Sequence, residues 1–170
     1  VREAMRVLLR TYSQACWQDL KGAPEAIEAG ADRARERLNE ASAHVARAEW
    51  KQAQRALTAA RTELNAADRR AGQVTGRVEE LKAVAADPQA PVEGVRFAVR
   101  DAQRLAMAQP GGAAPHHARV LDSLVERLEN APQRLTGPNP DYWGYLQELE
   151  SIKTAAGDVV TRIRAERAGG

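Results

Sequence analysis

The chain is poor in aromatic residues, in cysteine and in long apolar runs. Aromatic side chains make up 4% of its 170 residues, which disfavours an all-β or a doubly wound α/β fold. The single cysteine, Cys16, has no partner for an internal disulfide, so nothing calls for an oxidising compartment. No uninterrupted apolar run approaches the roughly 18 residues that a membrane-spanning helix needs. We therefore expect a cytoplasmic protein.

Residues that favour helices are abundant instead. Alanine occupies 34 positions, and arginine supplies 21 of the 25 basic residues. Both residue types stand near the top of the helix-propensity scale, and together with Glu and Leu they are typical of long helices and coiled coils. The sequence predicts an all-α fold, an elongated helical hairpin or bundle of about five helices around one long, heptad-patterned coiled-coil helix.

The first two predicted segments are an N-terminal amphipathic helix and the long helix. Residues 1–22 carry apolar side chains at spacings of three and four, which places them on one face of a helix. Residues 24–86 contain no proline after the first position, and we expect them to form the long coiled-coil helix. Breaks are expected, if anywhere, near Gly30, Gly72 and Gly76, because each glycine weakens a helix by about 1 kcal/mol relative to alanine.

The long helix carries a heptad seam that alternates large and small side chains. Its register slips by one residue near Trp50, which predicts a change in supercoiling or in packing partner at that point. The small seam residues allow close antiparallel packing of a partner helix. The seam that starts at Trp50 consists of Trp50, Ala53, Leu57, Ala60, Leu64, Ala67, Ala71, Val74, Val78, Leu81 and Ala85.

Residues 91–170 are expected to form three further helices, over 92–108, 116–131 and 140–166. Proline and glycine separate these segments, and Asn139 precedes the last of them as a suitable N-cap. The simplest assembly folds helix 92–108 back along the C-terminal half of the long helix, and the last two helices then complete a bundle. We expect a single domain, although seams this regular also allow pairing between chains. Because the chain starts with Val, we also expect it to be cut from a longer protein.

Motifs for catalysis, cofactors or metals are weak. His116 and His117 form the only histidine pair, but adjacent helical residues point about 100° apart and rarely bind one metal together. Glu40 and His44 lie one helical turn apart, a common chance spacing. Cys16 lies on an apolar helix face, which predicts a buried, inert thiol. We therefore predict a protein that is not an enzyme, with no cofactor and no metal site.

Arginine clusters suggest nucleic-acid binding as an alternative function. The candidate residues lie in the long helix, and they are Arg33, Arg35, Arg37, Arg69 and Arg70. Acidic residues are interspersed among them, and the formal net charge of the chain is only +2. Nucleic-acid binders carry a stronger and more one-sided positive charge, so this function is not favoured.

Protein interaction is the function that the sequence favours. Trp143 does not fit the heptad stripe around Tyr145, and aromatic anchors dominate binding hot spots, so Trp143, Tyr145 and Trp50 are the candidate interaction residues. The heptads resemble those of many bacterial coiled-coil and helical-hairpin proteins. We predict a non-catalytic helical scaffold or oligomerisation module that binds another protein or a second copy of itself. A weaker alternative is an accessory or sensory segment of a larger protein.

Overall fold

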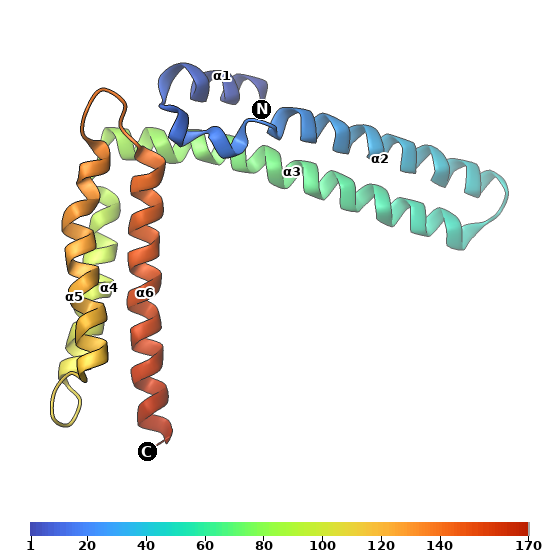
Figure 1. The fold of residues 1–170 in the computed structure, drawn as a ribbon. Helices are drawn as coiled ribbons and strands as arrows, with labels where there is room; N and C mark the ends of the chain where they lie inside the picture. The colour runs from blue at the N-terminus through green and yellow to red at the C-terminus, as the bar shows by residue number, and fades with distance from the viewer. Residues whose placement is uncertain (170) are drawn as a thin grey trace. The chain divides into compact units, whose positions relative to one another are not determined.

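The computed structural model describes residues 1–169 and is all-helical (Figure 1). No strand occurs among these residues, so the predicted all-α class is confirmed. The chain divides into two compact units, the first running from Val1 to Glu80 and the second starting at Leu81. The six α-helices within residues 1–169 are α1 (Arg2–Thr11), α2 (Ala23–Ala46), α3 (Trp50–Ala86), α4 (Ala90–Met107), α5 (Pro115–Asn130) and α6 (Tyr142–Gly169).

The first unit contains α1, two 3₁₀ turns, α2 and most of α3. Helix α1 buries Met5 and Leu8, and the 3₁₀ turns Gln14–Cys16 and Gln18–Leu20 bury their last residues. Cys16 is fully buried, as its place on an apolar face predicts. The segment that was expected to be one helix over residues 1–22 thus ends its α-helical part at Thr11 and continues as two short turns.

The expectation of a single helix over residues 24–86 is wrong. The chain forms two helices, which run antiparallel and side by side in Figure 1. The break falls at Arg47, Ala48 and Glu49, next to the register slip at Trp50, and Ala48 has a left-handed backbone with φ of 58°. None of the three glycines breaks a helix, and a Cβ at Gly30 would lie 3.5 Å from the Cβ of Ala67.

Alanines fill the space between α2 and α3. Because alanine side chains are short, the two helix backbones lie close together and the contact between them consists of methyl groups. The buried alanines are Ala34 and Ala41 on α2, and Ala53, Ala56, Ala60 and Ala67 on α3.

The second unit is built from α4, α5 and α6, which pack against one another (Figure 1). Within this unit, helix α4 packs against α5 and α6. Helix α6 contributes a stripe of large apolar side chains to the core, and their burial stabilises the unit. That stripe consists of Tyr145, Leu149, Ile152, Ala156, Val159 and Ile163.

The N-cap of α6 is Asp141, and not the expected Asn139. Its Oδ1 accepts a 2.8 Å hydrogen bond from the backbone N–H of Gly144, and the helix starts at Tyr142. Asp141 satisfies one of the N–H groups that a helix start leaves without an intrahelical acceptor. The hydroxyl of Tyr145, one turn further on, donates a 2.8 Å hydrogen bond to the carbonyl of Pro88 and so fixes the segment before α4 against α6.

Candidate functional site

Large apolar side chains lie on the outside of the α2–α3 pair, while the alanines lie inside. Trp50 is the most exposed of them, with 66% of its surface accessible, and Leu57 and Leu64 follow it at intervals of seven residues along α3. Leu38 and Val45 repeat the same interval on α2. We call Leu38, Val45, Trp50, Leu57 and Leu64 the apolar row.

All five residues of the apolar row fall on the same side of the α2–α3 pair. With 100° between successive residues, Leu38 and Val45 lie on one side of the buried alanine line of α2. On α3, Trp50, Leu57 and Leu64 lie on the same rotational side of the buried alanine line as Leu38 and Val45 do on α2. Because two antiparallel helices turn this rotational side toward the same face of the pair, all five residues lie on that face. Arg33 and Glu63 are displaced in the opposite sense, and they form an ion pair of 2.9 Å across the other face.

The Arg33–Glu63 pair also aligns the two helices along their length. It places Arg33 level with Glu63, and the approach of Gly30 to Ala67 repeats this alignment about one turn further along. Counting from these contacts, Leu38 lies within about two residues of the level of Leu57, and Val45 lies within about two residues of the level of Trp50. The apolar row therefore extends over both helices on one face of the pair.

The three aromatic candidates from the sequence differ in exposure. Trp50 is well exposed and belongs to the apolar row. Trp143 is half-buried at the start of α6. Tyr145 is fully buried in the core of the second unit, so its ring is not presented to a partner, because the α6 stripe turns it inward. Trp50 belongs to the first unit, whereas Trp143 and Tyr145 belong to the second.

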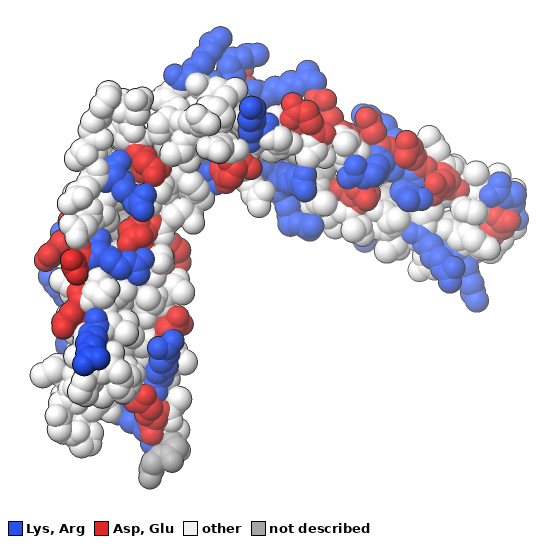
Figure 2. Space-filling model, in the orientation of Figure 1, with Lys and Arg blue, Asp and Glu red and all other residues white. Residues whose placement is uncertain are grey.

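The arginine candidates for nucleic-acid binding lie among carboxylates. Arg33 pairs with Glu63, Arg35 with Asp32, and Arg37 with Glu40. The two hydrogen bonds that Arg37 shares with Glu40, together with the negative charge of that carboxylate, raise the pKa of its guanidinium. The remaining candidates, Arg69 and Arg70, are exposed on α3. On the face drawn in Figure 2, positive and negative side chains are interleaved along the α2–α3 pair.

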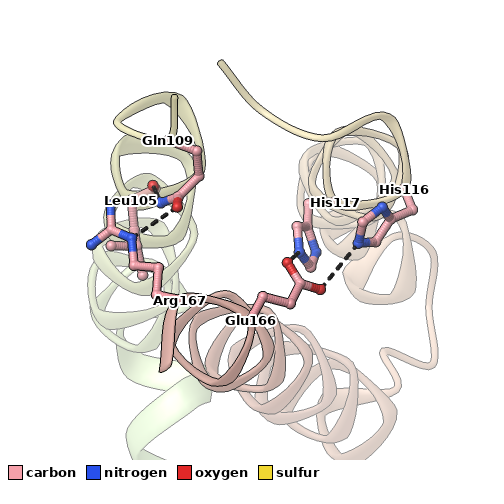
Figure 3. Close-up of polar contacts among 6 residues, drawn as sticks. All are labelled: Leu105, Gln109, His116, His117, Glu166 and Arg167. Atoms are coloured by element: carbon pink, nitrogen blue, oxygen red, sulfur yellow. Dashed lines mark hydrogen bonds and ion pairs between the residues drawn. The ribbon is translucent and has the colours of Figure 1, made fainter. Parts of the chain in front are cut away.

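A second cluster lies in the second unit, where α5 begins and α6 ends. His116 and His117 of α5 both turn their rings toward the carboxylate of Glu166 on α6 (Figure 3). The Nε2 atom of His117 lies 3.0 Å from Oε2, and the Nε2 atom of His116 lies 3.4 Å from Oε1. Among residues 1–169, these three form the one group of three or more His, Cys, Asp or Glu side chains with the spacing of metal ligands.

The charge on Glu166 is favoured by its two histidine neighbours. The hydrogen bond from His117 lowers the pKa of the Glu166 carboxyl, and His116 adds to this effect. Arg167, the next residue, turns to the other side of α6, where its Nε donates a 2.8 Å hydrogen bond to Gln109 (Figure 3). The guanidinium of Arg167 is thus held away from the histidines.

The sequence presents the two histidines side by side but gives no sign of Glu166. The signal was absent because 49 residues separate His117 from Glu166, and only the packing of α5 against α6 brings them together. The apolar row was visible in part, since Leu57 and Leu64 belong to the heptad seam. Its exposure could not be predicted, because the sequence does not show which seam residues the partner helix covers.

No helix within residues 1–169 is both long and apolar enough to cross a bilayer. No family model, curated protein or solved structure matches this chain.

Proposed function

We propose that the chain is a non-catalytic helical interaction module that associates with a second copy of itself through the apolar row. In this arrangement the α2–α3 pairs of two chains stack face to face as a four-helix, coiled-coil-like assembly. One observation supports the proposal most directly. The α2–α3 pair buries small alanines between its helices and exposes the larger side chains of Leu, Val and Trp, whereas a helical pair usually buries its large apolar residues.

A patch of this composition favours burial against another apolar surface. Covering the exposed part of each side chain contributes roughly 1 kcal/mol, and ten such side chains meet in a pair of chains. The loss of translational and rotational freedom on association costs from about 4 to 15 kcal/mol. The two quantities are similar, so we expect weak, concentration-dependent association. The exposed apolar residues recur every seven residues on both helices. Because this is the spacing of contacts between packed helices, the partner is expected to be helical.

The spacing of the apolar row is self-complementary. Trp50, Leu57 and Leu64 are evenly spaced, so a two-fold axis level with Leu57 sets each Trp50 opposite the Leu64 of the other chain. The same axis sets Leu38 near its own copy, because Leu38 lies near the level of Leu57. Val45 then faces Ala31, a smaller residue that lies within about one residue of the level of Leu64 by the alignment of Arg33 with Glu63. An isologous contact of this kind closes as a dimer.

Sedimentation velocity over a range of concentrations tests the proposal. The test variant is Trp50→Lys, and the matched control is Phe97→Lys, because Phe97 of α4 has the same exposed fraction, 66%, and lies outside the apolar row. We expect the wild type and Phe97→Lys to show the same dimerisation constant, and Trp50→Lys to weaken it at least tenfold, since the charge would be buried in an apolar contact. A wild type that stays monomeric at all concentrations would overturn self-association and leave the apolar row for a different helical partner.

A further inference from the structure

We propose that His116, His117 and Glu166 form a binding site for a divalent transition metal ion of the type of Zn²⁺. Two imidazole nitrogens and one carboxylate oxygen are ligands of intermediate softness, which suit zinc and its first-row neighbours. This inference is independent of the proposed self-association, because the site lies in the second unit and the apolar row lies in the first.

The distances between the ligand atoms fit a single ion. Zinc bonds to histidine nitrogen and carboxylate oxygen are about 2.0–2.2 Å long, so two ligands of a tetrahedral ion lie roughly 3.4 Å apart. The separations of the two Nε2 atoms from the nearest oxygens of Glu166 are 3.0 and 3.4 Å. All three side chains offer a ligand atom within 4.8 Å of the others. An ion can therefore enter with small rotations of side chains and no movement of the helices.

The fold holds the two histidines in a way that their sequence does not suggest. They occupy the first turn of α5, and their ring centroids lie 3.9 Å apart with the ring planes inclined by 47°. The side chain of His117 is only 3% exposed and is fixed by its surroundings, whereas those of His116 and Glu166 are more than half exposed. The site is thus anchored on one side and open to solvent on the other, so water can complete the coordination of an ion.

The third histidine of the chain provides an internal comparison. The Nδ1 atom of His44 lies 2.6 Å from Glu49, but the guanidinium of Arg47 lies 2.9 Å from the same carboxylate oxygen and 3.1 Å from the same ring nitrogen. A fixed cation thus occupies the position that a metal ion would take. At the proposed site the adjacent cation, Arg167, is directed toward Gln109 instead.

A bound ion would join the start of α5 to the last turns of α6. These two segments are far apart in sequence, and the hydrogen bonds of Glu166 link them at this end of the unit. A ligand that binds only the folded chain stabilises it by mass action, so the second unit is expected to unfold at a higher temperature when the ion is present.

Calorimetric titration of the chelator-treated, tag-free chain with Zn²⁺ tests the site. The test variants are His116→Ala and Glu166→Gln, whose side chains are exposed enough for the fold to tolerate them, and the matched control is His44→Ala. We expect one ion per chain in the wild type and in His44→Ala, and an affinity roughly tenfold or more lower in each test variant. Circular dichroism of each variant without metal verifies that it is folded.

Thermal unfolding provides the second readout. At a hundredfold excess of Zn²⁺ over its dissociation constant, we expect the midpoint of the wild type to rise by roughly 10 °C, and that of Glu166→Gln to change far less. The proposal is overturned if the wild type shows no saturable binding of one ion, or if both test variants bind Zn²⁺ as tightly as the wild type does.

Discussion

Arg77 of α3 and Asp19 of the second 3₁₀ turn form a two-point ion pair. The Nη1 atom of Arg77 donates to Oδ1 of Asp19 at 3.0 Å, and its Nη2 atom donates to Oδ2 at 2.8 Å. Nη1 also donates a 2.8 Å hydrogen bond to the carbonyl of Cys16. Because the guanidinium is buried, these contacts fix both 3₁₀ turns onto α3 within the first unit.

Replacing Asp19 by Asn is expected to lower the free energy of unfolding by about 2 kcal/mol. The substitution preserves the shape of the side chain but leaves the buried positive charge of Arg77 without its counter-charge. Urea unfolding followed by circular dichroism measures the loss, and hydrogen exchange should locate it in residues 1–80. The control is Glu3→Gln, which removes the exposed pair of Glu3 with Arg6 and should cost under about 0.5 kcal/mol. Equal losses in the two variants would contradict the role of the buried pair.

The contribution of Asp19 should depend on pH in the acidic range. Hydrogen bonds from Arg77 lower the pKa of the Asp19 carboxyl in the folded chain. A carboxyl with a lowered pKa stabilises the fold fully above its unfolded pKa, about 3.9, and loses this contribution as the pH falls through its folded pKa. The difference in free energy of unfolding between wild type and Asp19→Asn should thus stay constant between about pH 7 and pH 5 and shrink below about pH 4. Urea titrations at several pH values measure it, and a difference that grows toward acid pH would refute the assignment.

The break between α2 and α3 is a feature that the local sequence does not predict. Arg47, Ala48 and Glu49 are all compatible with a helix, so their identity gave no reason to end one. The slip of the heptad register near Trp50 was the only signal, and it allowed a change of packing partner without requiring a turn. The small seam residues led to the expectation that a separate helix packs on this segment, whereas its own two halves, α2 and α3, run side by side.

Replacing Ala48 by Gly should stabilise the first unit by about 0.5–1 kcal/mol. The N–H of Glu49 bonds to the carbonyl of His44, and the N–H of Ala48 bonds to that of Val45, so Ala48 holds the left-handed position that glycine usually takes at a helix end. Glycine removes the steric cost of the left-handed backbone at this position. This gain in stability exceeds the extra backbone entropy that glycine loses on folding.

The control for this prediction is the same substitution within α2. Ala43 is exposed and helical, so Ala43→Gly should destabilise the chain by about 1 kcal/mol. Thermal unfolding of the two variants should therefore give shifts of opposite sign. Shifts of the same sign would show that the backbone of Ala48 carries no strain.

Two glycines of α6 should respond in opposite ways to alanine. A Cβ at Gly144 would overlap the carboxylate of Asp141 and displace the N-cap, which costs about 1 kcal/mol. A Cβ at Gly157 would meet no atom within 4 Å, so Gly157→Ala should stabilise the helix by up to about 1 kcal/mol. Thermal unfolding measures both, and a stabilised Gly144→Ala variant would show that the cap of Asp141 does not hold α6.

The candidate sites were predictable only in part, for the same physical reason in both units. Periodicity identifies which residues share a helix face, so Leu57 and Leu64 were recognised as apolar seam positions and Tyr145 as part of a heptad. It does not identify which helix covers that face. Long-range packing decides which helices cover one another. It therefore determines the exposure of Leu57, the burial of Tyr145 and the contact of His117 with Glu166.

Cysteine cross-linking at Leu57 is the most direct test of the proposed self-association. In the two-fold arrangement, Leu57 faces its own copy, whereas Leu64 faces Trp50 of the other chain. Under mild oxidation, Leu57→Cys should form a covalent dimer, and Leu64→Cys should form little. The wild type should form none, because its Cys16 is buried. Absence of the Leu57→Cys dimer, or equal cross-linking at both positions, would contradict pairing through the apolar row.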